Sequence, residues 1–298
     1  MCQVRFSVVI PVYNCSKTIV RALESITNQN FNDYEVILIN DCSSDNSLSI
    51  IRSFCETHPK VRYYTNEENC GPAESRNRGI GAANGQYICF LDSDDFFSDS
   101  YFQTLDSIIE SEAPDTIYIG YNHLFENISR SVSNANYPDK DSFIAGASSA
   151  LWRFVVKSEI IRKFSLPNIR NAEDIAVIPL LINSSRKISY CPSTLYNYIH
   201  SNSSLSSIHS PDVSTNFIKS FNYTLTNIDK PYSPGIEFHG IKTILYGAIL
   251  NALKAGIPKK TIYNIIDDFE SMFSNWNRNR FIKTLPISKK NISFLSKK

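Results

Sequence analysis

A short apolar segment that runs directly into a cluster of carboxylates constrains this sequence more than any other feature. Residues Tyr87 to Leu91 are apolar without alternation, and Asp92, Asp94 and Asp95 follow at once. An uninterrupted apolar run of this length is typical of a strand buried on both faces, in a parallel sheet covered by helices. Because open α/β sheets bind ligands beyond the carboxyl ends of their strands, the sequence predicts that these carboxylates lie at a ligand site.

The residues alone leave two interpretations of this acidic cluster open. Closely spaced carboxylates repel one another, which favours a cation among them. All-oxygen ligands suit Mg²⁺ or Mn²⁺, which take phosphate groups and water as their remaining ligands. Alternatively, the segment is a solvated turn in which Ser93 or Asp95 caps the next helix.

The composition is that of a folded protein without a strong charge preference for its partner. The chain has 298 residues, of which 42% are hydrophobic and 20% charged, and a formal net charge of +1 gives no reason to expect nucleic acid as a partner. Its seven cysteines include no Cys-x-x-Cys pair, a pattern typical of free thiols in a reducing cytosol. We see neither a signal peptide nor an uninterrupted apolar run of about twenty residues, so we expect a cytoplasmic protein.

The order of the predicted elements indicates an α/β fold. The predicted strands are residues 6–11, 34–40, 61–64, 87–91, 116–121 and 187–199. The predicted helices between them are residues 16–28, with Ser16 as N-cap, 45–55, 73–83, 100–110 and 172–183. Alternation at this spacing predicts a mostly parallel central sheet flanked by helices.

Two later regions differ from this alternation. Residues 126–141 are rich in Ser and Asn without a period, so we expect a mobile loop there. Residues 213–281 have the pattern of two to four helices. We therefore expect an α/β domain at residues 1–210 and a helical C-terminal region at residues 211–298.

The turn after the first strand argues against a glycine-rich loop that binds the phosphates of a nucleotide. Residues 11–16 read Pro-Val-Tyr-Asn-Cys-Ser and contain no glycine, which excludes a G-x-G-x-x-G loop there, and no P-loop lysine pattern occurs in the chain. If a nucleotide binds, its phosphates must be held by a metal ion and basic side chains.

Five segments within the first hundred residues together resemble a known family. They are Val8–Asn14, Ile39–Asp45, Asn69–Ala73, Arg76–Ile80 and Tyr87–Asp95. In this order they resemble the opening motifs of family 2 glycosyltransferases, which have the Rossmann-like GT-A nucleotide-diphospho-sugar fold and are inverting. The resemblance continues more weakly through residues 152, 172–174 and 196–198, and it ends near residue 210.

The resemblance implies a nucleotide-sugar donor, and we expect a UDP-hexose or UDP-N-acetylhexosamine. The residues it assigns to the donor are Pro11, Tyr13, Asn14, Asp41, Arg76, Asp92 and Ser93. Asp41 would accept a hydrogen bond from the uracil NH, and Arg76 would pair with the diphosphate or order the acidic loop. Asp94 would bind Mn²⁺ or Mg²⁺ together with Asp92, the acidic pair known as the DXD motif. A role of Asp95 in the site is less well defined. It is about equally well explained as a helix cap or as the partner of an arginine.

Two positions depart from the family pattern. The chain has Cys42 where the family usually has glycine, and Ser75 where it usually has alanine. Both residues are small, so we expect tighter packing rather than lost function.

The resemblance also implies a catalytic base. In an inverting transfer an acceptor hydroxyl attacks the anomeric carbon directly, a carboxylate removes its proton, and the metal stabilises the leaving diphosphate. Asp174 matches the Glu-Asp motif of the family and is assigned as this base, and Glu173 as the residue that orients it or a sugar hydroxyl. From spacing alone, both would simply occupy the first turn of a helix, where the macrodipole favours carboxylates.

Two aromatic side chains carry weaker assignments. Trp152 matches a tryptophan that the family often carries near the acceptor, although a lone Trp is more often part of a core. The family's usual Trp-Asn-Lys-Leu is replaced here by Trp-Arg-Phe-Val, so the acceptor preference is not carried over. His200 is assigned to the diphosphate or the metal, with a solvated or capping His as the alternative.

The C-terminal end is basic from Arg278 to Lys298, and Trp276, Phe281 and Phe294 are interleaved with the charges. This pattern fits either a frayed, solvated tail or a peripheral contact with the anionic inner face of the cell membrane. The second interpretation would suit an acceptor carried on a polyprenyl-diphosphate lipid.

Together these observations predict a metal-dependent, inverting hexosyltransferase of bacterial surface-polysaccharide biosynthesis. It would transfer a hexose or N-acetylhexosamine to a hydroxyl of a saccharide or lipid-linked saccharide. A sugar-phosphate nucleotidyltransferase is a first alternative, but the Gly-x-Gly-x-Arg segment of that class is missing. A non-catalytic nucleotide- or sugar-binding module on a GT-A scaffold is a second, against which the intact Asp92, Asp94 and Asp174 argue.

Overall fold

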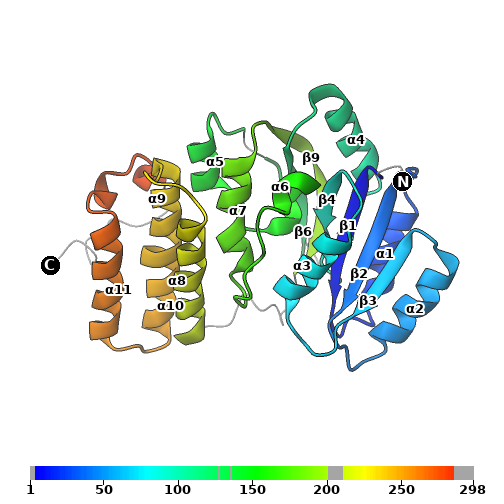
Figure 1. Cartoon of the computed structure of the whole chain (residues 1–298), viewed down its shortest axis with the longest axis horizontal. Coiled ribbons are helices and arrows are strands. Elements are labelled where there is room, and N and C mark those ends of the chain that lie inside the picture. The colour runs from blue at the N-terminus through cyan, green and yellow to red at the C-terminus, as the bar shows by residue number, and fades with distance from the viewer. Residues whose placement is uncertain (1–3, 127, 135, 201–210, 285–298) are drawn as a thin grey trace. The chain divides into compact units, whose positions relative to one another are not determined.

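The computed structural model describes residues 4–126, 128–134, 136–200 and 211–284 (Figure 1). By its internal contacts the chain divides into two compact units. The first comprises Met1–Asn136 and Ser149–Ser204, and the second Tyr137–Ser148 and Leu205–Lys298. The second unit thus includes a segment from the middle of the chain, which the sequence pattern did not indicate.

The first unit is built on one mixed sheet, which has nine strands within the described residues. The strands are β1 (Phe6–Val12), β2 (Tyr34–Asn40), β3 (Val61–Thr65), β4 (Tyr87–Phe90), β5 (Phe96–Phe97), β6 (Thr116–Leu124), β7 (Ser129–Val132), β8 (Phe154–Lys157) and β9 (Ile188–Ile199). Their order is β3-β2-β1-β4-β8-β6-β9-β5, with β7 paired to β6. The predicted α/β class is confirmed.

The parallel part of the sheet carries the strand ends that matter for function. Strands β3, β2, β1 and β4 are all parallel, and so are β6 and β9. Strand β8 lies antiparallel between β4 and β6 and joins the two parallel groups. All four residues of β4 are buried, as the unbroken apolar run predicted. The acidic cluster therefore begins where a central strand leaves the core.

Helices flank this sheet (Figure 1). They are α1 (Ile19–Thr27), α2 (Ser47–Thr57), α3 (Pro72–Ala82), α4 (Tyr101–Glu112), α6 (Ser158–Ile161), α7 (Glu173–Ser184) and the 3₁₀ turn η1 (Leu151–Arg153). Helix α1 buries Ile19, Leu23 and Ile26, the stripe that its spacing predicted.

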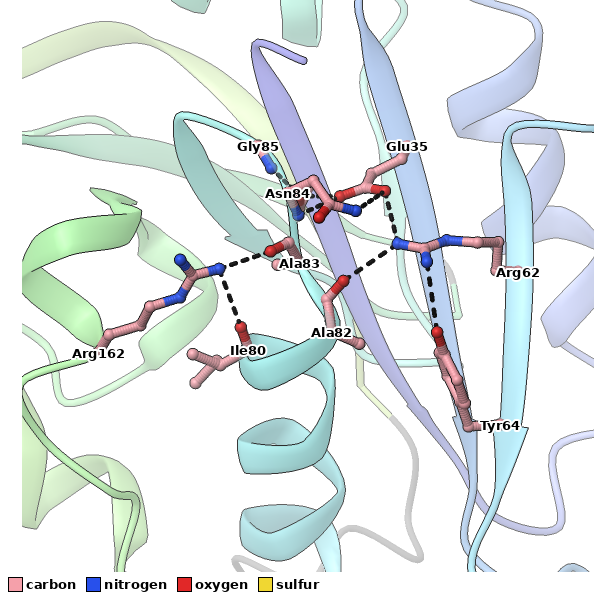
Figure 2. Close-up of polar contacts among 10 residues, drawn as sticks. Glu35, Arg62, Tyr64, Ile80, Ala82, Ala83, Asn84, Gly85 and Arg162 are labelled. Atoms are coloured by element: carbon pink, nitrogen blue, oxygen red, sulfur yellow. Dashed lines mark hydrogen bonds and ion pairs between the residues drawn. The ribbon is translucent and has the colours of Figure 1, made fainter. Parts of the chain in front are cut away.

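Helix α3 is held closely against the sheet at a glycine and at its C-terminal end. A Cβ atom at Gly79 would lie 2.4 Å from Cγ1 of Val9 on β1, so only glycine permits this approach. Arg162 and Arg62 donate hydrogen bonds to carbonyl oxygens at the end of the helix, and Arg62 is itself paired with Glu35 at 2.6 Å (Figure 2). These contacts satisfy the carbonyl groups that every helix end leaves unpaired.

The second unit is helical. It contains α5 (Lys140–Gly146), α8 (Pro211–Thr226), α9 (Pro234–Gly240), the π-helical η3 (Ile241–Ala248), α10 (Ile249–Lys254), α11 (Lys259–Met272) and the 3₁₀ turns η4 (Trp276–Arg278) and η5 (Ile282–Thr284). Because α9, η3 and α10 follow without a break, three long helices span residues 211–272, within the predicted two to four. Among the described residues, no helix is both long and apolar enough to cross a membrane.

Two local predictions were wrong. The mobile loop predicted at residues 126–141 contains the edge strand β7 and the start of α5, because pairing with β6 orders a segment that has no pattern of its own. Helix α1 begins at Ile19 rather than at a Ser16 cap. Residues 15–18 form a turn instead, and the backbone NH of Ser16 donates to the Asp45 carboxylate at 3.0 Å.

Candidate active site

The acidic loop after β4 contains two kinds of carboxylate. Asp95 is fully buried, and its two oxygens accept hydrogen bonds from the hydroxyl of Tyr196 and the backbone NH of Ile199, each at 2.7 Å. Burial raises the pKa of Asp95 to about 8, and the charge of Asp92 adds to this effect. Within the described residues Asp95 is therefore neither a helix cap nor an arginine partner, so the alternative that the sequence left open for it was wrong. It anchors the loop to β9.

The other two carboxylates of the loop remain accessible. The side chain of Asp94 is exposed, and that of Asp92 is 28% exposed. The backbone on either side is fixed, because Asp92 NH donates to the Tyr196 hydroxyl at 3.2 Å and Arg21 donates to the Asp94 carbonyl at 2.6 Å. The loop therefore presents Asp92 and Asp94 on a rigid backbone. Ser93 lies between them and is half-buried.

Arg76 connects this loop to the Glu-Asp motif. It projects from α3, is 7% exposed, and pairs with Asp92 at 2.8 Å and with Glu173 at 2.9 Å. Asp174 Oδ1 lies 3.9 Å from the same guanidinium nitrogen as Glu173. The surrounding carboxylates raise the pKa of Arg76 still further, against the opposing effect of burial. One buried cation thus holds carboxylates from β4 and from the start of α7 together.

Asp174 has the properties of a proton acceptor. Its Oδ2 accepts a hydrogen bond from the backbone NH of Leu151 at 2.9 Å. Its Oδ1 is shielded from solvent and has no hydrogen-bond partner among the described residues. Burial raises the pKa of Asp174 to about 7, Arg76 opposes this shift, and Glu173 adds to it. Both acidic residues also occupy the first turn of α7, so the helix placement predicted from spacing alone is correct as well.

Asp41 anchors a second loop beside this site. It follows β2 and is 3% exposed. Its carboxylate accepts hydrogen bonds from Asn66 at 2.8 Å, from Cys70 NH at 2.9 Å and from Gly71 NH at 2.8 Å. Gly71 has a φ of +87°, a conformation that glycine adopts without strain. Asp41 therefore stabilises the turn that precedes α3. Its Oδ2 accepts one of these hydrogen bonds, from Gly71 NH, and its Oδ1 accepts the other two.

Residues after β1 and β2 complete the edge of the site. Tyr13 is 52% exposed, whereas the side-chain oxygen of Asn14 accepts hydrogen bonds from the backbone of Ser44 at 2.8 Å and of Asp45 at 3.3 Å. Asn14 therefore ties the two loops together, a structural contact that its assignment to the donor did not include. Pro11 lies within β1, opposite Ile39 of β2.

The two departures from the family pattern are accommodated locally. Cys42 has a φ of +58°, the left-handed conformation that explains why a glycine is usual at this position. The hydroxyl of the buried Ser75 accepts a hydrogen bond from Asn66 at 3.2 Å.

Trp152 follows the residue that binds Asp174, whereas His200 has no described hydrogen bond or ion pair to the acidic loop. Trp152 follows Leu151, which binds Asp174, and its ring stacks on Tyr196 at 4.1 Å. His200 lies just beyond β9, where its ring is 5.2 Å from that of Phe125. The structure thus brings Arg76, Asp92, Glu173 and Asp174 into direct contact, while His200 stands with a separate group of rings.

Several contributors to the site were not found from the sequence. Leu151 contributes only its backbone NH, which carries no side-chain signal. Tyr196 and Asn66 could have been noticed as polar groups near the ends of β9 and β3, but nothing in their spacing names Asp95 and Asp41 as their partners.

The mixed sheet, with an Asp-x-Asp loop at the end of a central strand and a Glu-Asp pair beside it, places this protein in the class of GT-A glycosyltransferases. The profile of the family described as Glycosyl transferase family 2 matches residues 7–157, just over half of the chain. The chain therefore belongs to glycosyltransferase family 2, and the resemblance carried by its motifs is confirmed.

Two similar proteins come from bacteria. Glycosyltransferase GlyG of Streptococcus pneumoniae serotype 4 is 28% identical over 209 residues, which cover 64% of this chain and 69% of GlyG. Minor teichoic acid biosynthesis protein GgaB of Bacillus subtilis is 27% identical over 251 residues, which cover 81% of this chain but only 28% of GgaB.

A solved structure shares the fold. S. aureus TarS 1–349, in complex with UDP-GlcNAc, superposes with a TM-score of 0.75 at 20% identity, over 90% of this chain and 81% of that one. At this level of identity the likeness is one of fold.

Proposed function

We propose that this protein is an inverting glycosyltransferase that moves a hexose or N-acetylhexosamine from a UDP-sugar to a hydroxyl of a saccharide or lipid-linked saccharide in polysaccharide biosynthesis. The observation that carries the proposal is the contact of Arg76 with both Asp92 and Glu173, which sets the Asp-x-Asp loop beside the Asp174 carboxylate. The UDP-GlcNAc named for TarS and the teichoic acid named for GgaB support the donor and the pathway class.

A divalent metal fits the donor set of the acidic loop. Asp92 and Asp94 offer hard oxygen ligands from one rigid turn, while Asp95 is bound elsewhere. Among the described residues no group of three or more His, Cys, Asp or Glu side chains has the arrangement of a complete metal site. Two carboxylates still suffice for Mg²⁺ or Mn²⁺ where a diphosphate and water supply the remaining oxygens. When bound, the ion would neutralise charge on the leaving nucleoside diphosphate.

The chain's own groups would position the donor and handle the proton. Tyr13 offers an exposed ring for the base, and Asp41 fixes the turn beside it. The acceptor hydroxyl would give its proton to the carboxylate of Asp174, whose side chain is 21% exposed. Arg76 and Glu173 would keep that carboxylate oriented without taking the proton themselves.

The site gives no observation in favour of the two alternatives. A nucleotidyltransferase would hold a nucleoside triphosphate near the N-terminal strand with a glycine-rich segment, which this chain lacks. A non-catalytic module would have no need of a partly buried carboxylate with a pKa near neutrality beside the donor loop.

A peripheral membrane contact at the cytoplasmic face is a further part of the proposal. The structure changes which residues support it. Trp276 is buried and donates a hydrogen bond to Glu270, and Phe281 packs against Phe238 at 5.6 Å. Arg280 is paired with Asp139 at 3.2 Å. The contact would therefore depend on the remaining basic side chains, of which those beyond residue 284 lie outside the described residues.

The release of UDP from UDP-sugars, without added acceptor, tests the proposed reaction. We expect the wild type to release UDP from one of UDP-Glc, UDP-Gal, UDP-GlcNAc and UDP-GalNAc when Mn²⁺ or Mg²⁺ is present. Asp174→Asn should lower the rate by about 10²- to 10⁴-fold, because it removes the proton acceptor. Its affinity for UDP, measured by calorimetry, should remain that of the wild type.

Two results would contradict the proposal. Full activity of Asp174→Asn would remove this residue as the base. UDP binding without turnover of any of the four sugars, by the wild type, would favour the non-catalytic module.

A further inference from the structure

Two neighbouring parallel strands carry aromatic or imidazole rings along one face of the sheet at their C-terminal ends. Strands β6 and β9 pair in register, so that Tyr121 lies opposite Tyr196 and His123 opposite Tyr198. One residue pair further along the same face, the rings of Phe125 and His200 are 5.2 Å apart. We call this set the ring ladder; its members are Tyr121, His123, Phe125, Tyr196, Tyr198 and His200.

The rings of the ladder contact one another and Trp152. Trp152 stacks on Tyr196 at 4.1 Å and lies parallel to Tyr198 at 5.8 Å, with interplanar angles of 15° and 11°. His123 lies 4.9 Å from Tyr198 and 4.1 Å from Phe125. The alternate side chains point to the opposite face, where Asn122 and Asn197 hydrogen-bond at 2.9 Å. The rings therefore form one continuous row, of which Tyr196 is buried, Tyr121, His123 and Tyr198 are partly exposed, and Phe125 and His200 are exposed.

This surface runs from the candidate active site outward to solvent. Its inner end is Tyr196, which is fully buried and binds both Asp95 and the backbone of Asp92. Its outer end is exposed, with Phe125 at 41%. Four residues of parallel strand separate Tyr121 from Phe125, so the ladder is about 13 Å long.

The chemistry of the surface favours a saccharide as its occupant. Flat rings give apolar faces with polar edges, which suit a sugar that has both an apolar ring face and hydroxyl groups. Burial and the neighbouring His200 and Arg130 lower the pKa of His123, which favours its neutral ring.

We infer that the ring ladder binds the saccharide part of the acceptor beyond the sugar that carries the attacking hydroxyl. The inference rests on the proposed function and extends it, because the ladder starts at Trp152, whose neighbour Leu151 binds the Asp174 carboxylate. An acceptor hydroxyl at Asp174 would thus leave the next sugar units over Tyr198, His123 and Phe125. His200 then belongs to the acceptor side of the site, and not to the diphosphate or the metal.

A glycan-binding experiment tests this inference. The full chain is applied, with UDP and Mn²⁺, to an array of immobilised bacterial and synthetic oligosaccharides. We expect the wild type to bind at least one glycan of two or more sugars. Phe125→Ala and Tyr198→Ala should weaken that binding by about tenfold, the scale of one lost aromatic contact. Phe125→Tyr keeps the ring and should bind as the wild type does.

Controls separate this inference from the proposed function. Ile128→Ala removes an exposed apolar side chain outside the ladder and should leave glycan binding unchanged. UDP affinity, measured by calorimetry on the same variants, should also be unchanged, because the donor is held elsewhere. Binding of no glycan by the wild type, or equal binding by wild type and both alanine variants, would overturn the ladder as an acceptor surface. Failure of the wild type to bind UDP would instead count against the donor site.

Discussion

At the scale of single residues, the candidate site depends on one buried cation. Arg76 is enclosed by Asp92, Glu173 and Asp174, which come from two distant parts of the sequence. Each of these carboxylates would be costly to bury alone, and together they need a positive charge between them. Arginine suits the position because its planar fork of donors reaches two partners at once.

Arg76→Met is therefore expected to destabilise the protein. Removing one partner of a buried ion pair leaves uncompensated charge, and we expect a loss of about 3 to 5 kcal/mol in the free energy of unfolding. Urea unfolding measures this loss. Arg280→Met is the control, because its pair with Asp139 is about half exposed and should contribute about 1 kcal/mol or less. Equal effects of the two substitutions would contradict this role for Arg76.

The protonation of Asp174 should govern the pH dependence of the reaction. A base acts only when deprotonated, so with a pKa raised to about 7 its kcat/KM should increase from pH 6 to pH 8 and level off above that. Glu173→Gln removes a negative charge that raises this pKa, so the rising limb should move to lower pH. The measurement is UDP release against pH. A flat profile between pH 5.5 and 8.5 would be incompatible with Asp174 as the base.

The stability of the folded state should also depend on the protonation of Asp174. Stability should decrease as pH increases, whereas activity should increase. Because the pKa of Asp174 is raised above its unfolded value near 3.8, the folded state binds more protons than the unfolded state between the two values. This contribution to stability is present at low pH and is lost as pH increases toward 7.

At the scale of elements, the position of Arg76 depends on how closely α3 packs on β1. Gly79 faces Val9 at a distance that leaves no room for a side chain, whereas a Cβ atom at Gly81 on the same helix would have nothing within 4 Å. The two glycines therefore serve as a matched pair.

Substituting each of them by alanine should have effects of opposite sign. Gly79→Ala forces α3 away from β1 and should cost about 1 to 3 kcal/mol. Gly81→Ala meets no obstacle and should stabilise the helix by up to about 1 kcal/mol, since alanine loses less backbone entropy. Thermal unfolding of both variants measures the difference. Destabilisation by Gly81→Ala would show that the packing of α3 is not what distinguishes them.

The sequence predicted the elements that have a strong pattern of their own. The bounds of β2 were correct, and β4 was recognised because an unbroken apolar run permits few alternatives. Strand β7 was missed, since its Ser-Arg-Ser-Val sequence gains its order from β6. The inclusion of Tyr137–Ser148 in the second unit likewise follows from tertiary contacts alone.

The candidate site was predictable as a set of residues but not as a set of contacts. Motif resemblance gave Arg76, Asp92 and Asp174, and ordering of the acidic loop was one of the two roles expected of Arg76. The motif resemblance could not show that Asp95 anchors the loop to Tyr196, because that hydrogen bond joins positions about a hundred residues apart. The register that places Tyr196 beneath Trp152 is likewise set by the pairing of β6 and β9.

At the scale of the whole molecule, the C-terminal end offers a test of the proposed membrane contact. A chain trimmed from Lys283 loses Lys283 and the basic residues beyond residue 284, which lie outside the described residues. We expect it to lose co-sedimentation with anionic phosphatidylglycerol vesicles, since each basic residue near such a surface contributes about 1 kcal/mol. Neutral phosphatidylcholine vesicles are the control. Unchanged binding of the trimmed chain to the anionic vesicles would remove the membrane contact from the proposal.

The measurement that tests the central claim most directly is a calorimetric titration of UDP into the wild type and Asp94→Ala, each with Mn²⁺, with Mg²⁺ and with EDTA. Asp94 is exposed, and its carboxylate makes no described hydrogen bond or ion pair to another residue, so its removal should leave the fold intact. The account predicts metal-dependent binding of UDP by the wild type, weakened about 10- to 100-fold or lost in the variant. Binding of UDP by the wild type that is equally tight in EDTA and with either metal would contradict it, and so would binding by Asp94→Ala as tight and as metal-dependent as that of the wild type.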